Sequence, residues 1–440
     1  MAEKTPEEIW NLLKISKRVF LTGKGGTGKT FTTRKIIAHA ESEGYLVFPA
    51  ASTGIAARNL SDYATTIHSF LKLGIAENYD EISKSRAYKK LTFDFSNDKV
   101  LIIIDEISMI SKQIFEAILR IIEEKIERSI YGSREVLILL VGDCLQLAPV
   151  KSDEYFFESP QFGQFIPVPL LINKRNDDAD YNNFLNHLRY GIYERHDKEF
   201  LQSCSTEISE PSLYSSDDEQ QPIIIDNTNE TVKSINIQQL MKLEGAFYTF
   251  EGIFKIDKNI HNEAYQYYLD NKNSIMKDDA LSNVILKLGA KVMITKNDPE
   301  QGVVNGDIGF ITGIGERAVT VQLINNGLNT TIRLANKEIY DPIHRDGDGL
   351  PRLIGRIQYM PLKLAWAITA HKSQGLSFEN MWFNPLDCFT ASQVYVGFSR
   401  FAGGNLSVSS YHFERKVRVN YKALDFQRGI EEGGEYGQEF

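Results

Sequence analysis

Four short, almost continuously apolar runs constrain the fold of this chain more than any other feature. They are RVFLTG (18–23), YLVFPA (45–50), VLIIID (100–105) and EVLILLVGD (135–143). Runs of this kind are typical of strands that are buried on both faces of a parallel sheet. Helical patterns separate them, such as KTFTTRKIIAHAESEG (29–44) and KQIFEAILRIIEEKIERS (112–129), and the second has apolar residues at helical spacing with a polar opposite face. Strands and helices in alternation predict an α/β fold in which helices cover a parallel sheet.

The length of 440 residues predicts two or three domains, because a single core rarely organises so long a chain. We expect a first α/β domain over 1–172, interrupted by a polar insertion over 71–99. A second α/β domain is expected over 173–295 and 357–425, with 296–356 inserted into it. Short strands and Gly/Asn turns in GDIGFITGIGERAVTVQLINNG predict that this insertion is a small β-barrel. The composition of 426–440 is typical of a disordered tail.

The composition narrows the class of protein without identifying its partner. Hydrophobic residues make up 42% and charged residues 24%, which is ordinary for a globular protein, and no apolar run is long enough to cross a bilayer. The acidic N-terminus lacks a signal-peptide pattern, so we expect a cytoplasmic protein whose three cysteines form no disulfide framework. The net charge of −9 argues only weakly against a nucleic-acid partner, because a local basic groove suffices.

The segment GKGGTGKT (23–30) follows the first apolar run and opens a helical pattern. It fits G-x-x-x-x-G-K-[ST], in which glycines let the backbone amides wrap phosphate groups. We expect Lys29 to reach the β- and γ-phosphates and the Thr30 hydroxyl to hold Mg²⁺. The alternative is a chance glycine turn, but the preceding strand, the following helix and the full match favour a phosphate loop.

Two further strand ends carry residues suited to nucleotide hydrolysis. Asp105 ends the run LIIID, where a carboxylate can hold Mg²⁺, and the adjacent Glu106 can activate the attacking water. Gln146 in GDCLQL is placed to reach the γ-phosphate or that water. Taken alone, these residues could be an ordinary acidic pair and a loop glutamine. Their order after the phosphate loop favours hydrolysis of a nucleoside triphosphate with Mg²⁺.

Six segments in a fixed order give the most specific pattern in the chain. They are ASTGIAARNL, TTIHSFLKLG, IIIDEISMIS, GDCLQLAPV, LKLAWAITAHKSQGLSFENM and ASQVYVGFSR. This set resembles the superfamily-one DNA helicases, most closely the PIF-type (petite integration frequency) family related to the RecD-like helicases, from Arg18 to about Ser410. The resemblance implies two RecA-like P-loop domains with ATP between them and 5′-to-3′ translocation on single-stranded DNA. It also implies that 71–99 is a wedge domain and 296–356 an SH3-like domain.

The resemblance further implies roles for individual residues. Arg400 in GFSR and Arg175 in LINKRN would be arginine fingers, with a surface salt bridge as the alternative for Arg175. The nucleotide-binding residues would be Gly23, Gly25, Gly26, Thr27, Gly28, Lys29, Thr30 and Gly375. The DNA-binding residues would be Thr53, Gly54, Ile55, Thr66, His68, Phe70, Pro149, Val150, Asn229, His371, Lys372, Ser373 and Gln374. For His68 and Phe70 a place in the core is the alternative.

One departure from the family pattern concerns the base of the nucleotide. Related helicases carry a glutamine upstream of the phosphate loop that reads adenine, whereas the first glutamine here is Gln113. ATP with Mg²⁺ is still the expected cofactor, but no adenine-reading residue follows from the pattern.

The expected partners are single-stranded DNA and its junctions with duplex, with G-quadruplexes and RNA–DNA hybrids as further substrates. We expect a monomer that can pair on DNA. The alternatives are a RecD-like or relaxase-associated helicase and a nucleotide-gated clamp that binds DNA without unwinding it.

Overall fold

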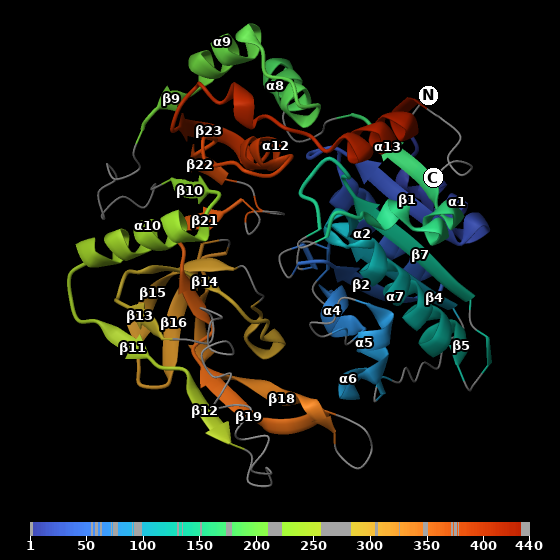
Figure 1. Cartoon of the computed structure of the whole chain (residues 1–440), viewed down its shortest axis with the longest axis horizontal. Coiled ribbons are helices and arrows are strands. Elements are labelled where there is room, and N and C mark those ends of the chain that lie inside the picture. The colour runs from blue at the N-terminus through green and yellow to red at the C-terminus, as the bar shows by residue number, and fades with distance from the viewer. Residues whose placement is uncertain are drawn as a thin grey trace.

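The computed structural model describes residues 3–432, apart from 54–55, 58–59, 62–63, 72, 74–77, 90, 92–98, 130–131, 134, 150–151, 173–177, 210–221, 257–282, 304–306, 325, 346–350, 371–372, 374–375 and 377. Figure 1 shows two halves side by side, one built from the first third of the chain and the other mainly from the remainder. Within the described residues, we find no helix with the length and hydropathy needed to span a membrane.

A six-stranded parallel sheet forms the centre of the first half, with the strand order β3-β2-β4-β7-β1-β8. The four strands predicted from the apolar runs are all present in it. The strands are β1 (Arg18–Gly23), β2 (Leu46–Ala51), β3 (Thr65–Thr66), β4 (Lys99–Asp105), β7 (Glu135–Gly142) and β8 (Ile166–Leu170).

Helices cover both faces of this sheet, which explains why its strands are apolar throughout. Leu101 and Ile103 of β4 belong to the core beneath α1 (Pro6–Ser16) and α2 (Lys29–Ser42). Ile102 and Ile104 point the other way, into the core beneath α7 (Lys112–Ile122). Side chains that alternate along a strand thus meet helices on either face.

The polar insertion over 71–99 adds two short helices to the α7 side of the sheet. They are α5 (Tyr79–Lys84) and α6 (Arg86–Lys89), preceded by α4 (Ile67–Phe70). Ile82, Tyr88 and Leu91 belong to the same core as α7, and the hydroxyls of Tyr79 and Tyr88 donate to Glu124. The insertion therefore packs on the first sheet; its role as a wedge stays a prediction.

The second half contains a parallel sheet with the order β21-β10-β22-β23-β9. Two such sheets confirm the predicted α/β fold class. Its strands are β9 (Thr206–Glu207), β10 (Ile223–Asp226), β21 (Ala367–Thr369), β22 (Phe378–Phe383) and β23 (Phe401–Val408). Its helices are α8 (Ala179–Arg189), α9 (Arg195–Cys204), α10 (Asn229–Lys242) and α12 (Gln393–Phe398).

An antiparallel sheet in the order β17-β16-β15-β14-β20 lies beside α10 (Figure 1). Its strands are β14 (Lys291–Ile294), β15 (Ile308–Ile314), β16 (Ala318–Leu323), β17 (Asn329–Arg333) and β20 (Leu362–Leu364). The β-rich insertion therefore extends past the predicted bounds of 296–356 on both sides. β14 is buried along its whole length.

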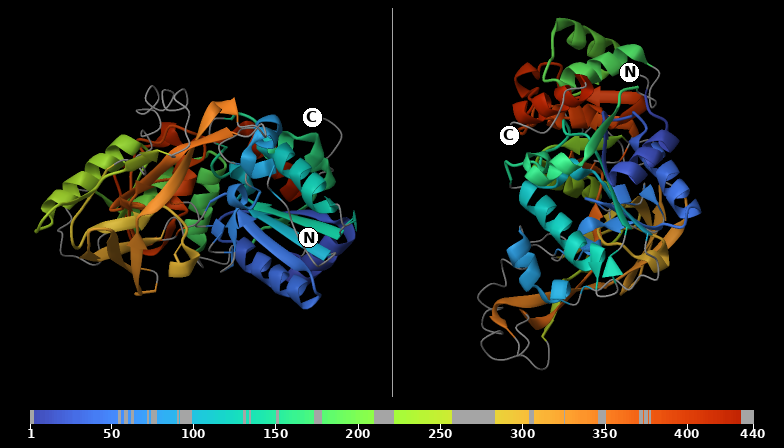
Figure 2. Two further views of the ribbon diagram at one scale, coloured as in Figure 1. Left: turned by 90° about the horizontal axis from the view of Figure 1, so that it is seen from below. Right: turned by 90° about the vertical axis from the view of Figure 1, so that its right-hand side faces the viewer.

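Two smaller antiparallel sheets flank this one. They consist of β11 (Tyr248–Phe250) with β13 (Val284–Leu286), and of β12 (Ile253–Ile256), β19 (Pro351–Tyr359) and β18 (Ala335–Arg345). The β18–β19 ribbon projects away from the remainder of the second half (Figure 2). A further two-stranded sheet pairs β5 (Arg128–Ser129) with β6 (Gly132–Ser133). The SH3-like nature of the insertion stays a prediction.

The C-terminal helix α13 (Tyr421–Glu432) corrects the prediction that disorder begins at residue 426. Phe426 and Ile430, four residues apart, enter the core of the first half, where Phe426 stacks on Phe157 at 4.0 Å between ring centroids. Figure 1 accordingly shows the red C-terminal helix beside the blue N-terminal strand. Residues 421–432 therefore pack on the first half, while 433–440 lie outside the described residues.

Candidate nucleotide and nucleic-acid site

The predicted phosphate loop joins the end of β1 to the start of α2. A Cβ on Gly23 would lie 2.5 Å from the carbonyl oxygen of Leu170 and 2.7 Å from Thr27 Oγ1, so only glycine fits there. Gly28 precedes α2 in the left-handed region, at φ 86°, where glycine is favoured. The predicted nucleotide-binding residues from Gly23 to Thr30 thus share one loop and the first turn of one helix, whose free amides form an anion site.

The Lys29 side chain folds back over this loop. Its ammonium group donates to the carbonyl oxygens of Gly23 at 2.5 Å and Lys24 at 3.1 Å. Burial lowers the pKa of Lys29, while the carboxylates of Asp143, Glu106 and Asp105 act in the opposite direction. The partly buried cation therefore lies near an acidic cluster, and a phosphate group at the loop would add compensating negative charge.

Asp105 and Glu106 lie where β4 ends. Asp105 Oδ1 accepts a hydrogen bond from the Glu106 amide at 2.8 Å, and Glu106 has the left-handed φ of 53°, which is uncommon for this residue type. Burial and the neighbouring Glu106 carboxylate raise the pKa of Asp105 to about 7. A divalent cation would relieve this repulsion, and the carboxylate of Asp105 and the hydroxyl of Thr30 are the oxygen ligands that Mg²⁺ prefers.

A buried ion pair next to the phosphate loop was not predicted. Asp143, at the end of β7, is completely buried and accepts from Arg189 Nη2 at 2.9 Å and from the Leu145 amide at 3.1 Å. The Arg189 guanidinium lowers the pKa of Asp143 despite its burial. Arg189 also donates to Glu431 of α13 at 3.1 Å. The ion pairs thus connect the first sheet, α8 and the C-terminal helix.

Tyr395 of α12 connects the second half directly to the phosphate loop. Its hydroxyl donates to Asp143 Oδ2 at 3.2 Å and accepts from the Gly25 amide at 3.1 Å. A second contact joins Lys24 Nζ to Asn186 Oδ1 of α8 at 2.9 Å. Elements from both halves therefore contact the loop that would hold the phosphates.

Gln146 lies beside the same cluster. Its backbone N–H donates to the Asp143 backbone carbonyl at 3.0 Å. Its side-chain Nε2 lies 3.5 Å from Asp143 Oδ2. The side chain is buried, within the loop that follows β7. The predicted proximity of this glutamine to the ends of β1 and β4 follows from the parallel sheet, in which strand carboxyl ends share one edge.

Arg400 follows α12, and its guanidinium is held inside the second half. It donates to Ser399 Oγ at 2.8 Å, to the Val396 carbonyl at 3.1 Å and to the Leu376 carbonyl at 3.5 Å. The preceding Ser399 lies near the phosphate loop, because a Cβ on Gly25 would lie 3.9 Å from Ser399 Cβ. The backbone of this segment is thus close to the loop, while the guanidinium contacts its own half.

The predicted DNA residues of the first half lie near the carboxyl ends of β2 and β3. Thr53 Oγ1 accepts from the Ala56 amide at 3.2 Å, and Thr66 is the last residue of β3. Burial lowers the pKa of His68. The Phe70 ring stacks on Phe48 with 5.0 Å between centroids and packs against the first core, which favours the packing alternative for Phe70.

The remaining predicted DNA residues are dispersed. Pro149 is buried in the loop after β7, Ser373 is completely buried with its hydroxyl donating to the Ala370 carbonyl, and Asn229 is exposed at the start of α10. Several predicted residues lie outside the described part of the chain and have no position here: Gly54, Ile55, Val150, Arg175, His371, Lys372, Gln374 and Gly375.

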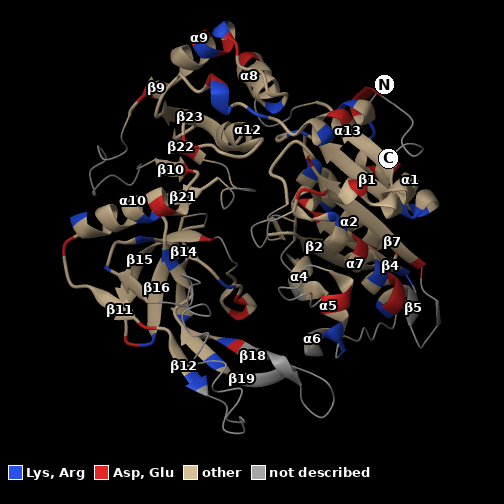
Figure 3. Ribbon diagram, viewed as in Figure 1, with Lys and Arg blue, Asp and Glu red and all other residues tan. Residues whose placement is uncertain are grey.

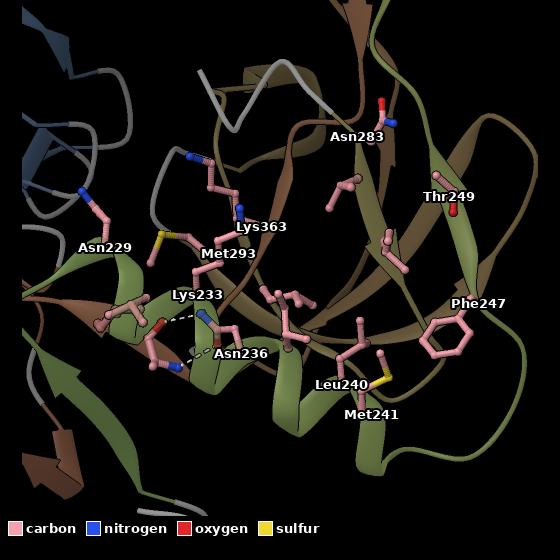
Figure 4. A pocket seen from close by; sticks show the side chains of 17 residues that line it. Asn229, Lys233, Asn236, Leu240, Met241, Phe247, Thr249, Asn283, Met293 and Lys363 are labelled. Atoms are coloured by element: carbon pink, nitrogen blue, oxygen red, sulfur yellow. Dashed lines mark hydrogen bonds between the residues drawn. The ribbon is translucent and has the colours of Figure 1, made fainter. Parts of the chain in front are cut away.

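A pocket of about 500 Å³ lies between α10 and the β-rich insertion (Figure 4). Its lining is mainly apolar, with Leu240, Met241 and Phe247 toward one end, and Lys233 and Lys363 among its polar residues. Of the predicted site residues, Asn229 lines it. The pocket is therefore separate from the phosphate loop.

The residues 7–157 match the family model described as PIF1-like helicase. The chain is 27% identical over 439 residues to the ATP-dependent DNA helicase Pif1 of Campylobacter jejuni, with 93% of this chain and 94% of that protein covered.

Among solved structures, the chain is similar to a Bacteroides Pif1 helicase in complex with ADP-AlF₃ and single-stranded DNA. The TM-score is 0.77, the identity is 26%, and the match covers 100% of both chains. A second structure, of two coordinating Pif1 helicases that unwind forked duplex DNA, matches with a TM-score of 0.71 and 25% identity over 100% of both chains. The expected resemblance to PIF-type helicases, with their RecA-like domains, is confirmed.

Proposed function

We propose that this chain is a PIF1-like helicase, an ATP-driven DNA motor that moves 5′ to 3′ along single-stranded DNA and separates the duplex ahead of it. The observation that carries the proposal is the contact of both halves with one phosphate loop. Tyr395 of α12 and Asn186 of α8 reach Gly25 and Lys24 from the second half. Nucleotide at this loop would therefore alter how the two halves pack.

In this proposal the first half binds and positions the nucleotide. The amides from Gly25 to Thr30 and the Lys29 ammonium would hold the phosphates, with Mg²⁺ between the Thr30 hydroxyl and the Asp105 carboxylate. Glu106 would orient and deprotonate the attacking water, and Gln146 would hold that water in line. The burial of Asp105 and Gln146 strengthens the electrostatic effect of this cluster on the transferring phosphoryl group.

Arg400 would supply the cation from the second half. It lies one residue from Ser399, which approaches Gly25, so a rearrangement of this segment would bring the guanidinium toward the γ-phosphate. Because the cation is useful only when the two halves close, hydrolysis would be linked to their relative motion. The proposed second finger, Arg175, rests on the sequence resemblance alone.

The proposed DNA path crosses both halves. Thr53, Thr66 and His68 would contact the strand from the first half, and Asn229 with the segment 371–374 from the second. Short hydroxyls, amides and a lysine suit contacts with phosphate that do not read the bases. The Bacteroides relative was solved with single-stranded DNA, which supports this assignment of the ligand class.

The proposed substrates extend from single-stranded DNA to forked duplexes, with G-quadruplexes and RNA–DNA hybrids as further candidates. Forked duplex DNA is supported by the relative whose two copies coordinate there. We propose that the chain is a cytoplasmic monomer that pairs on DNA.

The polarity of unwinding tests the proposal most simply. Two duplexes of the same sequence, one with a 5′ single-stranded tail and one with a 3′ tail, are incubated with the protein, ATP and Mg²⁺. We expect strand separation from the 5′ tail only. Separation from the 3′ tail alone would contradict the proposed direction. DNA-stimulated hydrolysis without separation of either duplex would contradict the unwinding activity and favour a translocase.

A further inference from the structure

Three metal-ligating atoms converge in the hairpin formed by α8 and α9. They are His187 Nδ1 in the last turn of α8 and His196 Nε2 and Asp197 Oδ1 in the first turn of α9. The separations are 2.7 Å from His187 to Asp197, 3.1 Å from His187 to His196 and 3.5 Å from His196 to Asp197. Figure 3 shows this hairpin at one end of the second half.

These separations match the spacing of ligands around a small tetrahedral cation. Bonds of about 2.0–2.1 Å to nitrogen and oxygen at tetrahedral angles place neighbouring ligand atoms about 3.3 Å apart. The three observed separations lie on both sides of that value. A point at an ordinary metal–ligand distance from all three atoms therefore exists.

Hydrogen bonding accounts for only part of this arrangement. A proton on His187 Nδ1 explains its short contact with Asp197, but it leaves His196 Nε2 facing the same two atoms. A proton on His196 Nε2 can serve either of the other two edges of the triangle but not both, because a neutral imidazole has one N–H. A cation at the centre would interact favourably with all three atoms.

The surroundings of Asp197 hold the carboxylate in place for such a role. Its other oxygen, Oδ2, accepts a hydrogen bond from the Glu194 amide at 2.8 Å, and the side chain is only 2% exposed. The His196 side chain is 58% exposed, which leaves one side of the site open to water. Three protein ligands with an open fourth position are a common arrangement for Zn²⁺. The hydrogen bond from the Glu194 amide to Asp197 Oδ2 orients the carboxylate, as hydrogen bonds to ligand side chains do in known metal sites.

We propose that His187, His196 and Asp197 bind a divalent transition-metal cation, with Zn²⁺ as the best match to two imidazoles and one carboxylate. The ion would fasten α9 to α8. It would act close to the nucleotide site, because His187 lies between Asn186, which contacts Lys24, and Arg189, which pairs with Asp143. The site is distinct from the proposed Mg²⁺ site, whose ligands are oxygens.

The test is a calorimetric titration of nucleotide-free, full-length protein with Zn²⁺, beside the variants His196→Ala and His187→Gln. We expect one equivalent bound by the wild type and affinity at least tenfold weaker in either variant. Cys204→Ser controls for the exposed thiol at the other end of α9, and His39→Ala for a histidine of the first half. Both controls should bind as the wild type does.

A second readout does not depend on the calorimetry. Saturating Zn²⁺ should raise the Tm of the wild type and of both controls, and leave the Tm of His196→Ala unchanged. Co²⁺ in place of Zn²⁺ should give the visible absorption of a tetrahedral site in the wild type only. The proposal is wrong if the wild type binds no Zn²⁺, if His196→Ala binds it unchanged, or if Cys204→Ser abolishes binding.

Discussion

Replacing Arg189 with alanine removes the cation that joins three parts of the molecule. The guanidinium is 2% exposed and pairs with Asp143 at 2.9 Å and with Glu431 at 3.1 Å. Glu431 is 18% exposed and can regain water, whereas Asp143 is completely buried. The variant therefore leaves one carboxylate without its counter-ion in a site that water does not reach.

The expected loss in the free energy of unfolding is about 3 kcal/mol at pH 7.5. Removal of one partner from a buried pair typically destabilises by about 3–5 kcal/mol. The lower end applies because Asp143 keeps hydrogen bonds from the Leu145 amide and the Tyr395 hydroxyl.

The effect should depend on pH in a defined direction. In the wild type Arg189 lowers the pKa of Asp143, so this ionised carboxylate contributes stability above its unfolded pKa, and the contribution is lost as the pH falls through the folded pKa. In the variant the pKa of Asp143 should rise, so that the carboxylate takes up a proton at higher pH. The difference in stability between the two proteins should therefore shrink between pH 7.5 and pH 5.

Urea unfolding followed by circular dichroism measures this difference, with Arg195→Ala as the matched control. Arg195 is 92% exposed and pairs with Glu199 on the surface, so its loss should change stability by about 0.5 kcal/mol or less. Adding Asp143→Asn to Arg189→Ala should recover part of the loss, because it removes the unpaired charge. A loss for Arg189→Ala below about 1 kcal/mol, or one independent of pH, would refute the reasoning.

Four further predictions test the site and the fold. Glu106→Gln should leave ATP binding intact and slow turnover about 10²- to 10⁴-fold in a single-turnover assay; unchanged turnover would exclude Glu106 as the catalytic carboxylate. Arg400→Ala should lower kcat about 10³-fold or more with little change in KM for ATP, because its contact forms mainly in the transition state; an equal effect on KM would contradict this. The Mg²⁺ concentration for half-maximal turnover should rise between pH 8 and pH 6, because protons compete for Asp105, whose pKa is raised to about 7; a constant requirement would oppose it. Phe426→Ala should lower the free energy of unfolding by about 3–5 kcal/mol in urea, and a surface-like effect would argue against α13 as part of the first core.

The sequence was most informative where local chemistry dictates local structure. The strands β1, β4 and β7 could be predicted because burial on both faces leaves a continuous apolar pattern. The positions of Lys29, Asp105 and Gln146 followed, since the carboxyl ends of parallel strands share one edge of the sheet. Gly23 could be recognised as part of a spaced motif, and the structure supplies the close contact that requires it.

The cluster around Asp143 could not be predicted in the same way. Its partners Arg189 and Tyr395 lie 46 and 252 residues away along the chain, and no spacing rule connects them. The only signal in the sequence was that Asp143 directly follows a buried strand, and this does not identify the residues that pair with it.

The C-terminal helix was missed for a different reason. The glycine and glutamate that follow suggested disorder, whereas Phe426 and Ile430, four residues apart, pack into the core of the first half. Packing of an apolar face stabilises such a helix more than local composition does.

The rate of ATP hydrolysis with and without single-stranded DNA tests the central claim most directly. If the two halves close on one phosphate loop when DNA lies across both of them, wild-type protein with ATP and Mg²⁺ should hydrolyse slowly alone and many times faster with an oligonucleotide. Hydrolysis at the same rate with and without DNA would contradict the proposed coupling between the nucleotide and the motion of the two halves.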